Sequence, residues 1–326
     1  TVSQSTPPTA DQMEKVNLHI PLKIALYDAK GTKQMLQHNG ELLSDVLNVI
    51  EKDQVFEFHG IYGRPIPALL CDFSAPVKLD YDYTTEQLLG LLKFADNQFA
   101  RWDAAQMLFT QELRRNVAHF QQGEAFDISP DILTALAHVL ENYEQDIELA
   151  TLILTLPKDI EFAENFKTID PDGISAAREF MLVQIAEYLK EDLLRIYTHI
   201  RLENYQVTQE DIALRAMRNL CLSYLAYTNL GNNVVQKHYN NANNMTDTLA
   251  ALNMATKAAL PCRDTLLADF EQKWQHDGLV MDKWFALQAT RPDENVLEIV
   301  QVLMDHPSFN FNNPNRLRSL VGSFAN

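Results

Sequence analysis

The stretch "APVKLDYDYTTEQLLGLLKFADNQFA", residues 75–100, contains the point at which the chain changes its periodicity. Before Thr84, apolar and aromatic residues recur at every second position, which is typical of a strand with one buried face. From Thr84 onward they recur at helical spacing, and Thr84 with Gln87 three residues later has the pattern of a capping box. The stretch therefore predicts a β region that ends near residue 83 and a helical region that begins at residue 84. The alternating residues are Val77, Leu79, Tyr81 and Tyr83.

The residues before this point predict an antiparallel sandwich. In "VNLHIPLKIALYD", residues 16–28, apolar residues alternate, and Pro21, which lacks an N–H, favours an edge position for this strand. "DAKG" predicts a turn with Gly31 at positive φ, and "QVFEFHGI", residues 54–61, is a further candidate strand. An immunoglobulin-like sandwich has about seven strands, whereas only four or five can be found here. We therefore expect residues 1–83 to form a partial immunoglobulin-like β-sandwich domain that is truncated at its N-terminus.

The residues after this point predict stacked helices. Amphipathic segments follow one another between short polar turns, and Ser129 before Pro130 has the pattern of a helix start. The segments are "SPDILTALAHVL", "TQEDIALRAMRNLCLSYLAYT", "TDTLAALNMATKAAL", "DGLVMDKWFALQA" and "NVLEIVQVLMDH". No fixed period repeats, so we expect residues 84–326 to form an irregular α-solenoid of stacked helical hairpins. The last apolar stripe has no polar capping helix after it, which predicts a domain that is truncated at its C-terminus. The stripe consists of Leu317, Leu320, Val321 and Phe324.

Composition and charge exclude several classes of partner. The chain has 326 residues, of which 46% are hydrophobic, and a formal net charge of −17 at pH 7. This acidic balance argues against nucleic acid and against an anionic membrane surface. No apolar run is long enough for a transmembrane helix. The three cysteines are Cys71, Cys221 and Cys262. They are far apart and in apolar settings, which favours buried thiols in a reducing compartment.

The motifs that usually mark an active site are absent from the sequence. A zinc hydrolase of the H-E-x-x-H type needs two histidines four residues apart on one helix, and no two of the nine histidines have that spacing. No G-x-S-x-G elbow is present. Cys262 lies beside Arg263, which could lower its pKa, but a buried structural cysteine is the simpler interpretation. His138 and His306 are interpreted as satisfied or partly exposed. We therefore predict no catalytic residue, no metal ligand and no cofactor-binding residue in this chain.

Several sequence blocks, in order along the chain, carry a resemblance to a known family. They are "SQSTPPTADQMEK", "LHIPLKIALYD", "IPALLCDFSAPVKLDYDY", "FARWDAAQ", "NNMTDTLAALNMA", "LPCRD", "DGLVMDKWFALQA" and "NPNRLRSLVGSFAN". Together they resemble the C-terminal half of bacterial aminopeptidase N, a zinc-dependent gluzincin alanyl aminopeptidase. The resemblance implies a cytoplasmic four-domain enzyme, of which this chain covers most of the third domain, a β-sandwich, and the first part of the fourth, a helical superhelix.

The resemblance also implies where the chemistry lies. The family's H-E-x-x-H motif, its downstream glutamate ligand and its G-x-M-E-N motif belong to the preceding catalytic domain, and none occurs here. Zinc is therefore expected in the parent enzyme and not in this fragment, which we expect to be inactive alone. The implied partners are the catalytic domain of the same polypeptide and peptide substrates, with no nucleic acid and no membrane.

The resemblance further implies a role for an arginine near the C-terminus. In this family the superhelix closes a chamber over the catalytic domain, and Arg318 in "NPNRLRS" falls on a position whose arginine faces that chamber. Its guanidinium could hold the C-terminal carboxylate or backbone carbonyls of a peptide. Arg316, a weaker candidate for substrate binding, should point to another side of the helix and anchor structure. An ordinary surface arginine is the alternative interpretation of each.

Two other clusters have alternative interpretations. Asn241, Asn243 and Asn244 could line the chamber, but we expect them to end one helix and to let Thr246 cap the next. Two adjacent aromatic residues, Trp284 and Phe285, are expected to pack between helices.

Three functions remain open at this point. The first is a non-catalytic portion of a metalloaminopeptidase, which closes the substrate chamber and selects peptides. The second is a free-standing helical-repeat adaptor that binds peptides or proteins on its concave face. The third is an enzyme that uses a chemistry with none of the motifs above.

Overall fold

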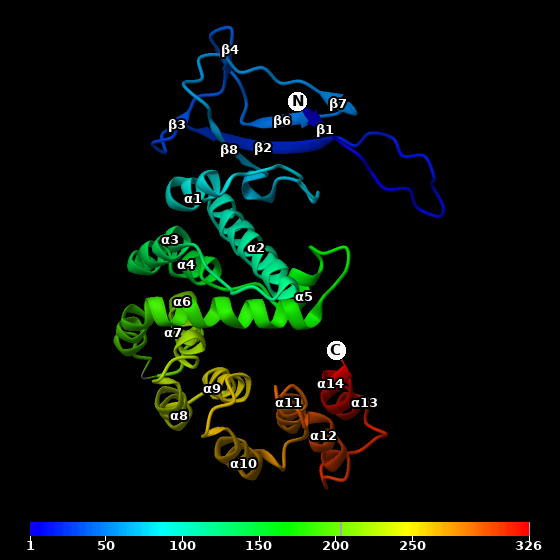
Figure 1. Cartoon of the computed structure of the whole chain (residues 1–326), viewed down its shortest axis with the longest axis vertical. Helices are drawn as coiled ribbons and strands as arrows, with labels where there is room; N and C mark the ends of the chain where they lie inside the picture. Colours follow the sequence, from blue (N-terminus) through cyan, green and yellow to red (C-terminus); the bar gives the residue numbers. More distant parts are fainter. Residues whose placement is uncertain (203, 326) are drawn as a thin grey trace. The chain divides into compact units, whose positions relative to one another are not determined.

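The structure, a computed structural model, describes residues 1–202 and 204–325. The chain divides into two compact units, the first formed by Thr1–Asn142 and Leu152–Arg178, the second by Tyr143–Thr151 and Glu179–Asn326. All strands of the described residues lie in the first unit, and helices follow them along the chain, as the change of periodicity predicts (Figure 1). Within the described residues, no helix combines the length and hydropathy that crossing a bilayer requires.

The β region is built around one long strand. β2 (Ile20–Tyr27) pairs antiparallel with β6 (Val46–Val49), with β8 (Ile66–Leu69) and with β3 (Lys33–Gln34). The remaining strands are short: β1 (Val2–Ser3), β4 (Gln37–His38), β5 (Glu41–Leu42) and β7 (Asp53–Gln54). Buried aliphatic side chains of β2 and β6 form the core of this region, among them Leu22, Ile24, Leu26, Leu47 and Val49.

The prediction that Pro21 places its strand at an edge is wrong, because β2 is the strand that the others join. Pro21 is in register with Asn48 of β6, whereas β8 joins only from Ile24 onward. The proline therefore lies in the half of β2 where its missing N–H removes no bond to β8. The predicted turn at Gly31 is confirmed, with φ of 85° at this glycine.

Two predicted strands are absent from the described residues. Of residues 54–61 only Gln54 belongs to a strand, and residues 75–83 form none. Their alternating apolar side chains nevertheless pack against the core of the β region, for example Phe56, Phe58, Val77 and Leu79. Alternation therefore correctly indicated that one face of each segment is buried, but apart from Gln54 the described backbone of these segments joins no β-ladder.

The junction between strands and helices agrees with the prediction. α1 (Thr85–Phe94) begins with the expected capping box, in which Thr84 accepts from the backbone N–H of Gln87 and the Gln87 side chain accepts from the backbone N–H of Thr84. A short break at Asp96 separates α1 from α2 (Gln98–Gln122), whose first turn is capped by Asn97. Tyr27 donates a hydrogen bond to Asp96, which also pairs with Lys33 at 2.9 Å. The break is thereby tied to β2 and β3.

Further helices follow α2 along the chain, and the first of them was predicted. α3 (Pro130–Glu141) begins at the proline after Ser129, although the Ser129 side chain makes no capping hydrogen bond. The remaining elements are η1 (Cys71–Phe73), η2 (Tyr143–Gln145), α4 (Ile147–Ile153), α5 (Asp159–Ala163) and α6 (Pro171–His199), and residues of α4 and α6 belong to both units.

In the second unit, consecutive helices pack on one another. α7 (Gln209–Leu225), α8 (Gly231–Asn241) and α9 (Met245–Lys257) contact each other, and the contacts continue from α9 through α10 (Arg263–Trp274), α11 (Gly278–Ala289) and α12 (Val296–Met304). This succession is what a solenoid of helical hairpins requires. The expected cap at Thr246 is wrong, because the Asn244 side chain accepts from the Asp247 N–H and starts α9 at Met245.

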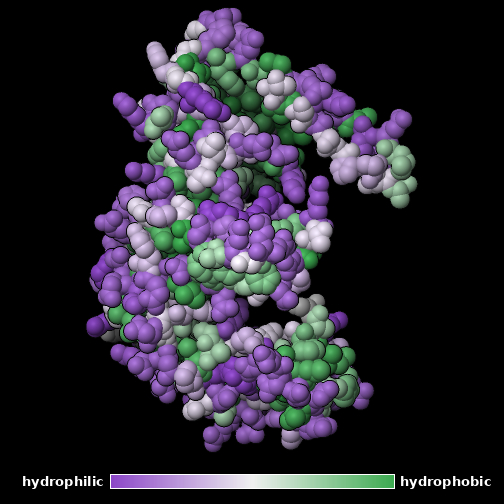
Figure 2. Space-filling view, viewed as in Figure 1, coloured by the Kyte–Doolittle hydropathy of each residue, from purple (hydrophilic) through white to green (hydrophobic). Residues whose placement is uncertain are grey.

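The last helical run consists of three pieces. α13 (Pro314–Leu317) continues into the π-helical segment η3 (Arg318–Gly322) and then into α14 (Ser323–Ala325). The apolar stripe of this run is only partly covered: Leu320 is fully buried, whereas Leu317 and Phe324 are exposed. Figure 2 shows hydrophobic side chains gathered on the visible face over these C-terminal helices.

The cysteines and the aromatic pair lie in the cores, as predicted. All three thiols are free and buried, and burial raises the pKa of Cys71 to about 11 and that of Cys221 to about 12. The pKa of Cys262 is also raised by burial, so Arg263 does not activate it. Trp284 and Phe285 are 3% and 0% exposed.

Candidate functional site

The turn that carries the predicted substrate arginines is shaped by an asparagine. The Asn313 side chain accepts hydrogen bonds from the N–H groups of Asn315 and Arg316, and Pro314 occupies the first helical position. Both features are standard for a helix start, so the sequence "NNPNRLR" folds locally into α13. This cap fixes the direction in which the next side chains leave the helix.

Arg316 points inward. Its side chain is 5% exposed; Nη1 donates to Ser308 O and Nη2 to Gly278 O, each at 2.8 Å. Nε lies 2.7 Å from Oδ1 of Asp282, and the guanidinium lies over the ring of Phe285, 4.9 Å from its centroid. A guanidinium with such partners is a structural clamp between α11, the residues before α13 and α13 itself, and it is not free to bind a ligand.

Arg318 points the other way. It is exposed, and no described residue forms an ion pair or hydrogen bond with its guanidinium. It begins the π-helical segment η3, and such widened turns occur frequently at functional sites. The two-residue spacing thus separates the pair as expected, one buried and one exposed. Of the two predicted residues, only Arg318 is available to an incoming anion.

A buried polar network in the same unit was missed by the sequence analysis. His238 is 2% exposed, and its Nδ1 lies 2.9 Å from the hydroxyl of Tyr197. Burial, assisted by the nearby charge of Arg218, lowers the pKa of His238 to about 4, so the imidazole is neutral at physiological pH. Arg215 and Asp247 are also buried, with Nε and Oδ2 3.8 Å apart. These groups come from α6, α7, α8 and α9, so no local motif could have indicated them.

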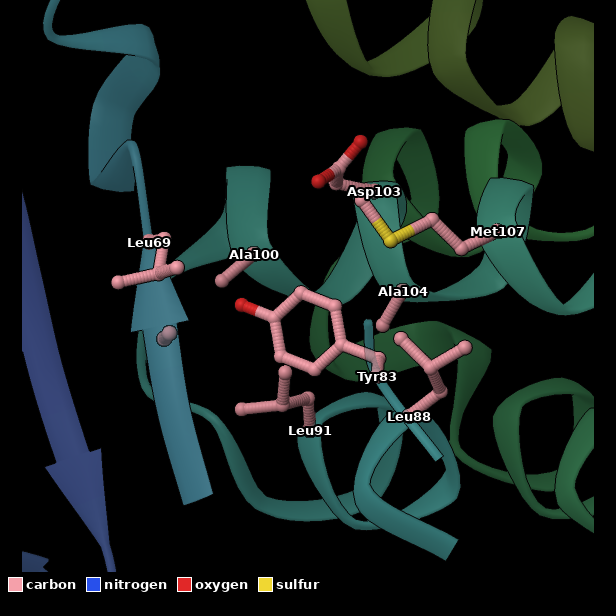
Figure 3. Close-up of a pocket in the computed structure, with 9 residues that line it drawn as sticks. Leu69, Tyr83, Leu88, Leu91, Ala100, Asp103, Ala104 and Met107 are labelled. Atoms are coloured by element: carbon pink, nitrogen blue, oxygen red, sulfur yellow. The ribbon is translucent and has the colours of Figure 1, made fainter. Parts of the chain in front are cut away.

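The first unit contains a small pocket beside the helical junction. Figure 3 shows the ring of Tyr83 among Leu88, Leu91 and Ala104, with Asp103 and Met107 nearby. The pocket has a volume of only about 10 Å³, room for about one water molecule, so it cannot admit an amino-acid side chain. Tyr83 donates a hydrogen bond to Pro67 O at 2.9 Å. Burial raises the pKa of Asp103 to about 6, and no described residue pairs with its carboxylate.

A second pocket of about 200 Å³ lies at the edge of the β region. Its lysines are already paired: Lys23 lies 2.6 Å from Asp72, and Lys33 lies 2.9 Å from Asp96. The pocket is therefore neutralised by its own carboxylates and shows no excess charge for a ligand.

Potential metal ligands were sought throughout the described residues. His138 and His306 are held by hydrogen-bond partners: His306 Nε2 lies 3.0 Å from Glu271, and Asn142 Nδ2 lies 3.3 Å from His138 Nδ1. One group of potential ligands does come together, in the β region: His38, Glu57 and His59. The sequence analysis predicted no metal ligand, because these residues have no spacing that a linear motif would detect.

Both regions of the chain match known protein families. Residues 85–326 match a family model described as a domain of unknown function (DUF3458_C) with ARM repeats, and residues 1–82 match one described as a domain of unknown function (DUF3458) with an Ig-like fold. The predicted fold class, an immunoglobulin-like β region followed by an irregular helical-repeat region, is thereby confirmed.

Curated relatives and a solved structure are similar over nearly the whole chain. The chain is 88% identical to aminopeptidase N of Haemophilus influenzae and 49% identical to that of Escherichia coli, in each case over 100% of this chain and 38% of the relative. The crystal structure of Legionella pneumophila aminopeptidase A in complex with aspartic acid superposes with a TM-score of 0.81 at 28% identity, covering 94% of this chain and 36% of that chain. The chain thus spans little more than a third of the length of these proteins.

The clamp formed by Arg316 makes a prediction about stability. Arg316→Lys keeps the charge but cannot reach Ser308 O, Gly278 O and Asp282 together, so we expect a loss of about 2–3 kcal/mol in the free energy of unfolding. Chemical denaturation measures it. Arg318→Lys, the matched control two residues away, should change the free energy by less than about 0.5 kcal/mol. Equal effects of the two substitutions would show that Arg316 is not a clamp.

The pocket beside Tyr83 makes a prediction about pH. The pKa of Asp103 in the folded state, about 6, lies above its ordinary value of 3.8, so stability is lost as the pH rises between these values. Asp103→Asn should therefore stabilise the protein by on the order of 1 kcal/mol near neutral pH, after a discount for partial exposure, and the effect should vanish below about pH 3. Thermal unfolding at several pH values measures the difference. The exposed Asp80→Asn is the control, and a pH-independent effect of Asp103→Asn would contradict the prediction.

Proposed function

Because this chain belongs to the bacterial aminopeptidase N family, whose members it matches over their C-terminal part, we propose that it is a non-catalytic portion of a zinc-dependent aminopeptidase. The parent enzyme would release N-terminal amino acids, of the alanine type, from peptides in the cytoplasm. The observation that carries the proposal is the likeness of the whole chain, over both of its regions, to relatives named aminopeptidase N.

The proposal assigns the two regions to two domains of that enzyme. Residues 1–83 would be its β-sandwich domain and residues 84–326 its helical superhelix domain. The family models, which meet between residues 82 and 85, and the capping box at Thr84 support this boundary.

The two-histidine helix that would hold the catalytic zinc ion of the parent enzyme has no counterpart in the sequence of this chain. Catalytic zinc sites of this class use two histidines of one helix and a third ligand, and no two histidines here are four residues apart. Two histidines of the second unit already have partners: His238 contacts the hydroxyl of Tyr197, and His306 contacts the carboxylate of Glu271. No catalytic step is therefore assigned to this chain, and zinc belongs to the catalytic domain of the same polypeptide.

The contribution of this chain would be to close the substrate chamber and to select peptides. Arg318 supports that role, since it is exposed and without a carboxylate partner among the described residues in a chain of net charge −17. Its fork of N–H groups matches the two oxygens of a peptide C-terminal carboxylate. Arg316 supports it only indirectly, by fixing the helix that presents Arg318.

A free-standing helical-repeat adaptor is the second candidate. The stacked helices α7 to α12 support it, because such stacks offer extended binding surfaces. The two candidates differ in what must accompany the chain, since the adaptor would act without a catalytic domain.

The proposal predicts that the chain has no peptidase activity of its own. Residues 1–326 incubated with an alanyl p-nitroanilide and added zinc should release no p-nitroaniline, whereas the full-length enzyme should do so under the same conditions. Circular dichroism of the chain establishes that it is folded in the assay. Turnover by the folded chain at a rate close to that of the full-length enzyme would defeat the proposal.

The role of Arg318 predicts a specific kinetic pattern in the full-length enzyme. Arg318→Ala should raise KM for peptides with a free C-terminal carboxylate by about 5- to 30-fold, since a charge-assisted bidentate contact contributes about 1–2 kcal/mol. The same peptides with an amidated C-terminus, and an alanyl p-nitroanilide, should show little change. Arg195→Ala removes another exposed arginine and is the control. Identical losses for acid and amide peptides would exclude the carboxylate contact.

A further inference from the structure

The β hairpin formed by β4 and β5 places one histidine in a defined position. β4 pairs antiparallel with β5, with His38 opposite Glu41. The two residues between the strands, Asn39 and Gly40, have φ of 50° and 86°. Positive φ at both central residues is the condition for a tight type I′ turn, for which Asn-Gly is the preferred sequence. His38 is therefore held directly at the end of a rigid hairpin.

A second segment is fastened to this hairpin by its backbone. The N–H of His59 donates to Gln37 O at 2.7 Å, and the N–H of Asn39 donates to Nδ1 of His59 at 3.1 Å. Gly60 has φ of 71°, a backbone conformation that favours glycine over residues with a Cβ. This segment brings His59 beside His38 although the two are far apart in the sequence.

Three side chains with metal-ligand chemistry gather at this contact. The ligand atoms of His38, Glu57 and His59 all lie within 4.8 Å of one another, and the two imidazole rings have their centroids 4.4 Å apart. Glu57 precedes His59 by two residues. His38 is half-buried, whereas Glu57 and His59 are exposed, so an ion can reach the group from solvent.

We propose that His38, Glu57 and His59 form a binding site for a divalent transition-metal ion of the Zn²⁺ class. Imidazole and carboxylate together favour Zn²⁺ and its neighbours over Mg²⁺ and Ca²⁺, which prefer oxygen ligands alone. Ligand atoms about 2.0–2.2 Å from a tetrahedral ion lie roughly 3.3–3.5 Å from each other. The group therefore has to contract by little more than an ångström, which rotation of exposed side chains supplies without a change of the backbone.

The existing hydrogen bond of His59 sets the strength of the site. Nδ1 accepts from Asn39, so the neutral ring carries its proton on Nε2. An ion at Nε2 requires the proton to move to Nδ1, and an ion at Nδ1 takes the place of the Asn39 N–H; either way this hydrogen bond is lost. Three protein ligands leave further coordination positions to water. The site is accordingly weaker than a closed four-ligand structural zinc site.

This site is separate from the zinc chemistry of the proposed function. It lies in the β region, uses neither an H-E-x-x-H pattern nor a helix, and does not depend on whether the parent protein is a peptidase. A site of this kind would couple metal concentration to the order of the β4–β5 hairpin and of residues 57–60.

The experiment titrates the chain, freed of metal with a chelator, with Zn²⁺ by calorimetry and with Co²⁺ by visible absorption near pH 7.5. We expect one ion per chain and a Co²⁺ spectrum with nitrogen ligation. His38→Ala and His59→Ala should each lower the affinity by more than about tenfold. Glu57→Gln should lower it less than either.

The control is His19→Ala, which removes an exposed histidine of the same region whose Nε2 lies 2.8 Å from Asn48. It should leave the titration unchanged. Thermal unfolding in chelator establishes that each variant is folded, and His38→Gln replaces His38→Ala if the alanine variant is not. The proposal would be overturned if the chain did not bind Zn²⁺ at millimolar concentration. It would also be overturned if the unsubstituted chain, His38→Ala and His59→Ala bound Zn²⁺ with equal affinity.

Discussion

The C-terminal end of the described chain depends on the burial of one guanidinium. The side chain of Arg316 is almost completely buried, and a buried charge is tolerated when it is paired and hydrogen-bonded. Two backbone oxygens accept hydrogen bonds from the guanidinium, the carboxylate of Asp282 supplies the opposite charge, and the guanidinium lies over the ring of Phe285. These partners belong to α11 and to the residues before α13, so one side chain of α13 sets the mutual positions of these three pieces. Because Arg316 points inward, Arg318 must point outward.

Polar side chains also join neighbouring elements elsewhere in the molecule. The break between α1 and α2 is tied to the strands by contacts among Tyr27, Asp96 and Lys33. In the second unit, a contact between Tyr197 and His238 joins α6 to α8. Buried thiols have raised pKa values, the lysines of the larger pocket are neutralised, and the smaller pocket holds no more than a water molecule. The interior chemistry of this chain is therefore structural, and its binding chemistry lies on exposed side chains. That division agrees with the proposal that this chain shapes access to a reaction carried out by another domain.

Local sequence patterns predicted those features that local interactions determine. The capping box at Thr84 and the turn at Gly31 were found because each needs only a few neighbouring residues. Strands were wrongly predicted at residues 54–61 and 75–83, because alternation indicates only that one face of a segment is buried. A strand also needs a hydrogen-bonded partner, and the neighbouring sequence does not indicate where that partner lies. Thr246 was predicted as the cap of α9 instead of Asn244 because both residue types are good caps and the two lie only two residues apart. At the sites, the exposure of Arg318 follows from spacing, but the partners of Arg316 and the meeting of His38 with His59 require the folded chain.

We propose that the helix held in place by Arg316 presents Arg318 to a bound peptide. A structure of the full-length enzyme with a bound peptide would decide this. We expect the guanidinium of Arg318 to lie within hydrogen-bond distance of the peptide's C-terminal carboxylate, while Arg316 remains on Asp282. A peptide carboxylate bound by other residues, with Arg318 in open solvent, would contradict it.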